Sequence, residues 1–377
     1  MIRAVTLLVV GLVLVIASAT AHADVQRTLA GSLQLDYLAV PTESHPAAYT
    51  FDATTVELSL KMSVDFSKNA SATVKACFAC HGFEAAAAFV DLRAADELRV
   101  RVGRMTPSFG SFPERYDPAN HRTSDKPLPY DMGRMLHKNE WNEGVLPAPW
   151  VDNGVEVGGT HFFESGRVDY AVYALSGPKA DATASDFDFV RSHTPGQYYV
   201  DNNSEPIVGA RLAGTLEADD FSLTGGASGM AGHYDPDRKL GFAIVGADVV
   251  AKIEDIYVRA EYLLRRTEMN LGAMPAMNFK PGPDGGFDDT FSKHGFYVES
   301  EVPVGPVDLI ARFDGLRRIG NVPIASPLAY HASLTRYTLG AAMRVTASVR
   351  IKTSVEYYQF SDFANELAIH LGVATPF

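Results

Sequence analysis

VELSLKMSVDF, residues 56–66, alternates apolar and polar side chains without a break. Apolar residues occupy every second position from Val56 to Phe66, and polar or charged residues occupy the positions between them. Successive side chains of a β-strand point to opposite sides of the sheet. A period of two therefore predicts a strand with one apolar and one polar face.

The same alternation recurs at 256–265 and 349–358, and weaker versions follow one another along the chain. Clusters of turn residues separate them, as between the strands of an antiparallel sheet. About sixteen strands are predicted in all, with ends uncertain by about two to four residues. They lie near 33–39, 54–66, 71–78, 84–92, 97–104, 154–163, 168–175, 207–216, 220–229, 241–250, 255–264, 294–302, 306–313, 336–345, 349–359 and 366–377.

The connections between these strands alternate between short and long. Turns of a few residues, such as 67–70 and 94–97, alternate with loops rich in Gly, Pro and Asp. The long loops are 105–153, 176–206, 230–240, 265–293 and 314–335. In transmembrane barrels the strand number is even, short turns face the periplasm and long loops face outward. The pattern predicts an all-β fold, a transmembrane antiparallel β-barrel over residues 24–377 with a long loop at 105–153.

Size and composition agree with a barrel. Of the 377 residues 46% are hydrophobic, yet the formal net charge is −12 and the mean hydropathy is −0.03. A soluble core usually splits into domains beyond about 250–300 residues, whereas a barrel turns its apolar face outward to lipid. The acidic balance argues against a nucleic-acid partner. We expect the lipid of the outer membrane to surround the barrel.

Both ends of the chain carry signals. Residues 1–23, MIRAVTLLVVGLVLVIASATAHA, combine a basic start, an apolar core and a small-x-small end, which predicts a cleavable export signal peptide. The last predicted strand, 366–377, is amphipathic and ends in Phe377. Such an end resembles the assembly signal of bacterial outer-membrane barrels. It implies the outer membrane as location and the barrel-assembly machinery as a partner.

A more specific resemblance lies in FEAAAAFVDLRAADELRVRVGRMTPSFG, residues 83–110. An aromatic-rich strand, a short turn, a Val-Gly-Arg element and a Pro-Phe-Gly loop are similar to a hairpin of porins of the phosphate-selective porin O/P type. The resemblance implies a sixteen-stranded homotrimer that passes anions, with an inward-folded loop and basic residues along the lumen.

Charged residues of both signs fall on the inferred inward faces. Acidic residues there include Glu57, Asp65, Glu261, Asp308 and Glu356. A cluster of arginines at one height would favour small anions. Paired charges in a hydrated lumen would not, and both readings stay open. The predicted pore-lining cations are Arg99, Arg101, Arg259, Arg312, Arg344, Arg350 and Lys352.

The chain has only two cysteines, in KACFACHGF, residues 75–83. Cys77, Cys80 and His81 form the Cys-x-x-Cys-His pattern of covalent c-type haem, with His81 as the proximal iron ligand. The two thiols could instead form a local disulfide in the oxidising periplasm or half of a metal site. On the predicted topology, Thr73, Lys75 and Cys77 face the lumen, and the motif caps an outer hairpin.

A sixth ligand to the iron would have to come from elsewhere, and the loop 105–153 is the natural source because it folds inward. Met or His at that position would tune the potential of the haem. Candidate sixth ligands in and next to the loop are Met105, His121, Met132, Met135 and His137.

Three functions follow from these features. The first is a barrel that carries haem c and transfers electrons at or across the outer membrane, with a periplasmic or surface cytochrome as partner. It is weakly similar to fused monohaem cytochrome–porins. The second is a passive, anion-preferring diffusion porin with a Cys77–Cys80 disulfide and no haem. The third is a sheath for a separate cytochrome. No hydrolase triad, phosphate loop or dinucleotide fingerprint stands out, so we expect transport or electron transfer rather than catalysis.

Overall fold

The computed structural model describes residues 25–41, 54–79, 82–132, 134–141, 144–178 and 201–377. The predicted signal peptide, residues 1–23, lies outside the described residues. So do Cys80 and His81 of the haem motif.

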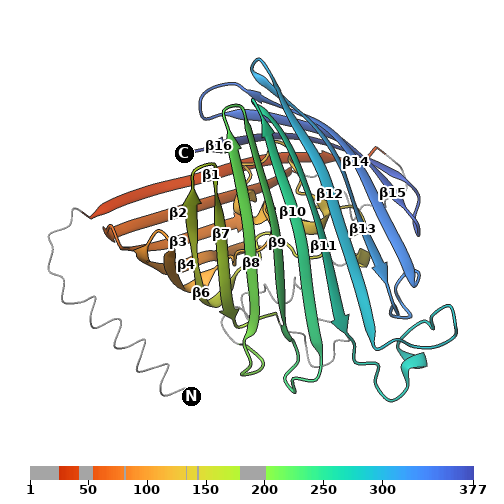
Figure 1. The fold of residues 1–377 in the computed structure, drawn as a ribbon. Helices are drawn as coiled ribbons and strands as arrows, with labels where there is room; N and C mark the ends of the chain where they lie inside the picture. Colours follow the sequence, from red (N-terminus) through yellow and green to blue (C-terminus); the bar gives the residue numbers. More distant parts are fainter. Residues whose placement is uncertain (1–24, 42–53, 80–81, 133, 142–143, 179–200) are drawn as a thin grey trace.

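Sixteen antiparallel strands form one closed barrel, in which each strand pairs with its neighbour in sequence and β1 pairs with β16 (Figure 1). The predicted fold class is confirmed. The strands are β1 (Gln26–Ala39), β2 (Thr54–Ser67), β3 (Ala70–Ala79), β4 (Gly82–Ala95), β5 (Leu98–Met105), β6 (Asp152–Phe163), β7 (Gly166–Leu175), β8 (Ile207–Ala218), β9 (Phe221–His233), β10 (Gly241–Ile253), β11 (Ile256–Glu268), β12 (Thr290–Val304), β13 (Val307–Ile319), β14 (His331–Arg344), β15 (Arg350–Phe360) and β16 (Glu366–Pro376).

Side chains alternate between the lumen and the outer surface along each strand. On β3, Thr73, Lys75 and Cys77 are buried inside the barrel, whereas about half of Val74 and Phe78 is exposed on the outside. The same holds around the ring, where large apolar side chains such as Leu, Val, Phe and Tyr cover the outer surface. An apolar outer face and a polar inner face are what a barrel in lipid requires.

Several strands are longer than predicted at the long-loop side. β11, β12, β13 and β14 each continue four to six residues farther than the alternation of apolar residues. Charged or polar side chains occupy both faces there, as Arg265 and Arg266 do on β11. Strand pairing therefore continues beyond the residues whose alternating pattern predicts the strand. β1 likewise begins at Gln26 rather than near residue 33.

The β3–β4 hairpin ends lower than its neighbour. Phe78 near the end of β3 pairs with Leu58, while β2 continues for four more residues, from Thr54 to Glu57, along β1. The wall is therefore shorter at this hairpin than at β1 and β2. Cys77 lies opposite Ser59 on β2 and Glu84 on β4, just past a register shift between Lys75 and Ala76 in the β3–β4 ladder.

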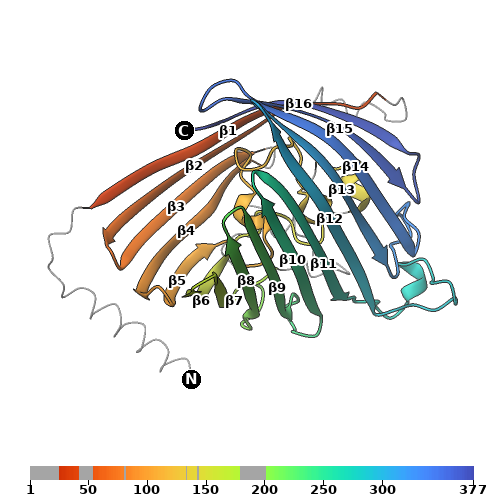
Figure 2. The same ribbon diagram turned by 45° about the horizontal axis from the view of Figure 1, so that its top comes forward.

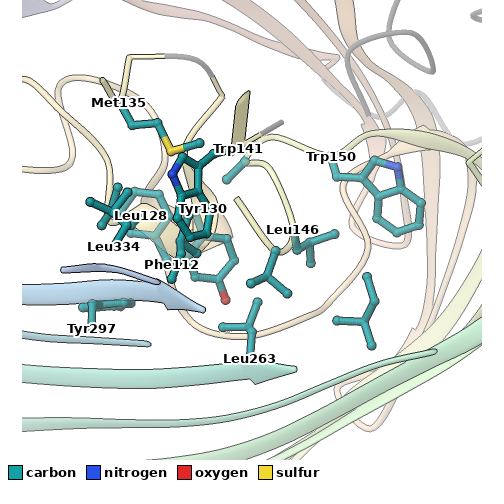
Figure 3. Packing of buried hydrophobic residues seen from close by; sticks show 14 of the residues in the cluster. Phe112, Leu128, Tyr130, Met135, Trp141, Leu146, Trp150, Leu263, Tyr297 and Leu334 are labelled. Carbon is teal, nitrogen blue, oxygen red and sulfur yellow. The ribbon is translucent and has the colours of Figure 1, made fainter. Parts of the chain in front are cut away.

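The segment 106–151 between β5 and β6, called here the constriction loop, lies inside the ring of strands (Figure 2). It contains the short helices η1 (Phe112–Arg115), η2 (Leu128–Tyr130) and α2 (Lys138–Trp141). The core of the molecule forms where this loop packs against the inner wall (Figure 3). Residues of this core include Phe112, Leu128, Tyr130, Met135, Trp141, Leu146 and Trp150 of the loop and Leu263, Tyr297 and Leu334 of the wall.

The barrel closes between its first and last strands. Gly31 of β1 and Phe377 exchange two backbone hydrogen bonds, of 2.8 and 3.0 Å. The Phe377 ring covers Gly31 so closely that an added Cβ would lie 2.5 Å from a ring carbon. Among the described residues, no helix is both long and apolar enough to cross a membrane.

Candidate functional site

One carboxylate of the wall holds the first helix of the constriction loop. Glu261 of β11 accepts hydrogen bonds from the backbone N–H groups of Ser111 (3.1 Å) and Phe112 (2.7 Å) and from the Ser111 hydroxyl (2.6 Å). The hydroxyls of Tyr130 and Tyr297 also donate to it, each at 2.6 Å. Five donors on one carboxylate fix the start of the loop to the wall.

A buried ionic network holds the middle of the loop. Arg336 of β14 is fully buried and contacts Asp125 of the loop, Asp314 (2.6 Å) and Glu356 (3.1 Å). Asp314 also accepts the backbone N–H of Leu128 at 2.9 Å. Because buried charges are costly unless they are paired and hydrogen-bonded, this network opposes movement of the loop away from β13–β15.

A cavity of about 800 Å³ remains between the constriction loop and the opposite wall. Ser108, Ser111, Glu114 and Arg115 of the loop form one side. The other side is formed mainly by β4 to β8, with contributions from β9 to β11. Six arginines line the cavity: Arg93, Arg99, Arg115, Arg167, Arg211 and Arg259. Three carboxylates line it as well, namely Asp96, Glu114 and Asp169.

Several of these arginines stand in front of their counter-charges. Arg99 pairs with Glu156 at 3.1 Å; the Arg99 side chain is 32% exposed, whereas that of Glu156 is fully buried. Arg211 binds both oxygens of Asp248, whose side chain is 1% exposed. At these two pairs, a solute in the cavity meets the guanidinium group first and the carboxylate behind it second.

Gly226 allows the Arg211–Asp248 pair to form. A Cβ at Gly226 would lie 2.7 Å from the Arg211 guanidinium and 2.9 Å from the Asp248 carboxylate. The missing side chain leaves room for the pair to cross from β8 to β10 over β9.

Glu114 is the carboxylate that the loop presents to this arginine wall. It is exposed to the cavity, and desolvation within the enclosed lumen raises the pKa of its carboxyl, although nearby Arg211 opposes the rise. A glutamate with a raised pKa takes up its proton at a higher pH than usual. On acidification the cavity therefore loses this negative charge at a higher pH than it would with an ordinary glutamate.

The structure places the predicted lumen cations at different depths. Arg99 and Arg259 line the cavity. Arg101 faces inward but binds both oxygens of Asp91, at 2.8 and 3.0 Å.

The remaining four predicted lumen cations lie closer to the constriction loop or the periplasmic end. Arg312 and Lys352 are buried beneath the constriction loop, and Arg350 donates to a loop carbonyl at 3.0 Å. Arg344 lies near the periplasmic end of β14, where its side chain is 57% exposed.

Sequence reasoning missed four arginines of the cavity and Glu114. Arg211 lies on a predicted strand and shares the inward parity of the residues that were found, so alternation could have identified it. Arg93 and Arg167 adjoin turns, where alternation stops. Arg115 and Glu114 belong to a loop without any period, and only its folding into the barrel brings them to the site.

Only one residue of the haem motif is described. Cys77 faces the lumen and is 7% exposed. Lys75, one inward position away on β3, contacts Tyr116 and Asp117 of the constriction loop, the latter at 2.6 Å. The loop therefore packs against the wall next to Cys77.

The candidate sixth ligands differ in their surroundings. Met105 and Met135 are buried, Met132 is half-buried, and His137 lies 3.0 Å from Glu366. His121 is 3% exposed, and neither ring nitrogen has a hydrogen-bond partner in the described part of the chain. Burial, reinforced by nearby Lys352, lowers the pKa of His121 well below its usual value and keeps the imidazole neutral.

No family model matches the sequence, and no curated protein matches it. Solved structures do. The outer membrane channel DcaP of Acinetobacter baumannii is similar with a TM-score of 0.58 and 12% identity, covering 95% of this chain and 99% of that chain. OmpF of Salmonella typhi gives a TM-score of 0.55 at 12% identity, covering 93% and 97%.

The anion-selective porin from Comamonas acidovorans gives a TM-score of 0.51 at 12% identity, covering 94% of this chain and all of that chain. At these identities the likeness concerns the fold, which is that of a porin barrel.

Proposed function

We propose that the protein is a passive pore of the bacterial outer membrane that favours small anionic solutes. The arrangement of charge in the cavity carries this proposal, because six arginines and three carboxylates line its surface, and the carboxylate partners of Arg99 and Arg211 are buried behind their guanidinium groups. Rings of basic side chains favour anions in channels. The apolar outer face of the barrel and the fold shared with an anion-selective porin support it.

Reversal potentials in planar lipid bilayers test this function. Under a tenfold KCl gradient we expect a reversal potential with the sign of a pore that prefers chloride over potassium. An Arg167→Gln/Arg211→Gln variant should shift the potential toward zero or beyond it, because it leaves Asp169 and Asp248 without their cations. An Arg266→Gln/Arg317→Gln variant removes two cations from the outer surface and should leave the potential unchanged. A cation-preferring wild-type pore would refute the proposal.

We also propose covalent haem as a second possibility, since two observations favour it. Cys77 points into the lumen beside the constriction loop, and that loop holds His121 neutral with both ring nitrogens free of described hydrogen-bond partners. A bound haem would supply one-electron redox chemistry. Cys77 and Cys80 would attach the haem, and His81 would ligate its iron. The low exposure of Cys77 means that the contact of Lys75 with Tyr116 and Asp117 would have to open.

A pyridine-haemochrome spectrum of the denatured protein decides between these possibilities. The protein must be produced in cells that carry the haem-ligation machinery. A c-type band that disappears in a Cys77→Ala/Cys80→Ala variant would establish the haem, and a partner cytochrome would then be sought. Wild-type protein without the band would exclude covalent haem and leave the diffusion pore.

Trimer formation is a further part of the proposal, supported by an OmpT structure of Vibrio cholerae described as a trimer form. Light scattering of the purified protein in detergent, corrected for the bound detergent, should give about three times the mass of one chain. A monomeric mass would contradict it.

A further inference from the structure

Three adjacent strands each carry two consecutive basic residues near their long-loop ends. These pairs are Arg265–Arg266 on β11, Lys293–His294 on β12 and Arg317–Arg318 on β13. Lys293 pairs across the sheet with both Arg265 and Arg318, so the three dipeptides lie side by side. Because side chains alternate, each dipeptide presents one basic residue to the lumen and the other to the outer surface.

The lumen-facing members already have partners. Lys293 donates to the carbonyl oxygen of Trp141 in the constriction loop at 2.5 Å. Arg318 donates to the carbonyl oxygens of Gly320 and Asn321 at 2.9 and 2.6 Å. Arg265 is buried, with its guanidinium 5.6 Å from the centre of the Phe291 ring. Lys293 and Arg318 therefore hold loops against the wall.

The outward-facing members, called here the outer basic patch, are Arg266, His294 and Arg317. His294 and Arg317 are directly opposite each other on β12 and β13. Arg266 pairs with Ser292, two residues from His294, and so is its diagonal neighbour. Arg266 and Arg317 are exposed, His294 is half-buried, and neither arginine has a described carboxylate within ion-pair distance.

Acidic residues are scarce around this patch. On the outward faces of β10 to β14, the one carboxylate is that of Glu268, which accepts the backbone N–H of Gly241 at 2.7 Å. The Tyr262 hydroxyl and His294 Nδ1 lie within hydrogen-bond distance, at 2.5 Å. Arg266 and Arg317 therefore have no carboxylate within ion-pair distance in the described protein, and an anion from outside would supply their counter-charge.

An aromatic band runs just below the outer basic patch. Tyr262, Phe296, Phe313 and Tyr337 point outward from β11 to β14. The rings of Phe296 and Phe313 lie 5.2 Å apart, and those of Phe313 and Tyr337 lie 5.0 Å apart. Aromatic girdles of barrels mark the boundary between hydrocarbon and headgroups. The basic side chains, nearer the strand ends, lie at headgroup depth.

We propose that the outer basic patch binds the phosphate groups of a lipid in the external leaflet. Arginine forks match phosphate oxygens in a bidentate geometry, and the aromatic band offers a surface to the apolar part of the same lipid. The site lies outside the lumen and is separate from the solute path. It rests on the outer-membrane location proposed above and on no property of the pore.

Native mass spectrometry of the delipidated full chain in detergent tests this site, with bisphosphorylated lipid A as the probe. Wild-type protein should retain lipid A, and an Arg266→Ala/Arg317→Ala variant should bind it about tenfold or more weakly. The Arg266→Lys/Arg317→Lys variant should keep part of the binding because it keeps the charge. Dephosphorylated lipid A should bind equally weakly to all of these proteins.

A matched control removes two cations elsewhere at the same end of the barrel. Arg238 and Lys239 lie in the exposed β9–β10 loop, and an Arg238→Ala/Lys239→Ala variant should bind lipid A like wild type. Equal retention by all variants, or equal binding of dephosphorylated lipid A, would overturn the proposal. Bilayer conductance of the same preparations reports separately on the pore and on correct folding.

Discussion

At the scale of single residues, the cavity depends on which charge is exposed and which is covered. Arg211 shows this because its partner Asp248 is nearly inaccessible. Glu114 is the opposite case, a carboxylate that faces the cavity from the loop. The selectivity of the pore should therefore respond to the protonation of Glu114.

The raised pKa of Glu114 predicts a pH-dependent selectivity. As the pH falls from 7 toward 4, its carboxylate takes up a proton before an ordinary glutamate would, and the cavity loses one negative charge. The chloride preference should rise. In a Glu114→Gln variant the preference should already be high at pH 7 and change less. Reversal potentials at stepped pH measure both profiles; identical profiles would show that Glu114 has no part in selectivity.

The residue scale also shows where sequence reasoning stops. Alternation along strands is enough to turn Arg99 and Arg259 inward, because a strand fixes the direction of its side chains. Glu114 and Arg115 have no such rule, since their positions depend on contacts made more than a hundred residues away along the chain, such as those with Glu261. Alternation also does not predict which arginines form ion pairs, because these pairs depend on how the strands and the loop pack.

At the scale of elements, the constriction loop and the strands differ in how far they could be predicted. The sixteen strands follow from hydrophobic period and turn spacing, and the inward folding of the loop was expected from a resemblance. The ends of β11 to β14 could not be predicted, because charged or polar side chains on both faces interrupt the alternation there. The contacts that hold the loop could not be predicted either, since they join polar residues of no fixed spacing.

Substitution of Glu261 tests whether its hydrogen bonds hold the start of the constriction loop in place. A Glu261→Gln variant replaces one acceptor oxygen by an N–H₂ donor, so some of the five donors lose their partner, at a cost of about 1–3 kcal/mol. The start of the loop should loosen, and single channels should show a larger mean conductance and noisier open current. A Glu254→Gln variant, at an exposed residue of the β10–β11 turn, serves as the control. Unchanged channel records would show that other contacts suffice.

At the scale of the whole molecule, stability depends on closing the ring between β1 and β16. A Gly31→Val substitution places side-chain atoms where the Phe377 ring and the Ser59 carbonyl oxygen lie, 2.5 and 2.6 Å from an added Cβ. Overpacking of this kind typically costs about 1–3 kcal/mol. The temperature at which the folded barrel loses its fast migration in SDS gels should fall.

Gly214 provides a matched comparison on the same outer surface, since nothing lies within 4 Å of an added Cβ there. A Gly214→Val variant should keep the wild-type transition temperature. If both valine variants lower the transition temperature equally, the decrease would come from the replacement of glycine and not from the closure between β1 and β16.

The paired basic residues of β11 to β13 have a consequence for assembly. If β12 were to slip by one residue against its neighbours, Lys293 and His294 would exchange sides, and each face would still hold one basic residue. These charges therefore give no penalty against misalignment. The position of Gly295 does penalise a shifted register. A side chain brought to this inward position would meet Val145 and Pro129 of the constriction loop, which lie 2.8 and 3.0 Å from an added Cβ. The constriction loop therefore disfavours the shifted register of β12.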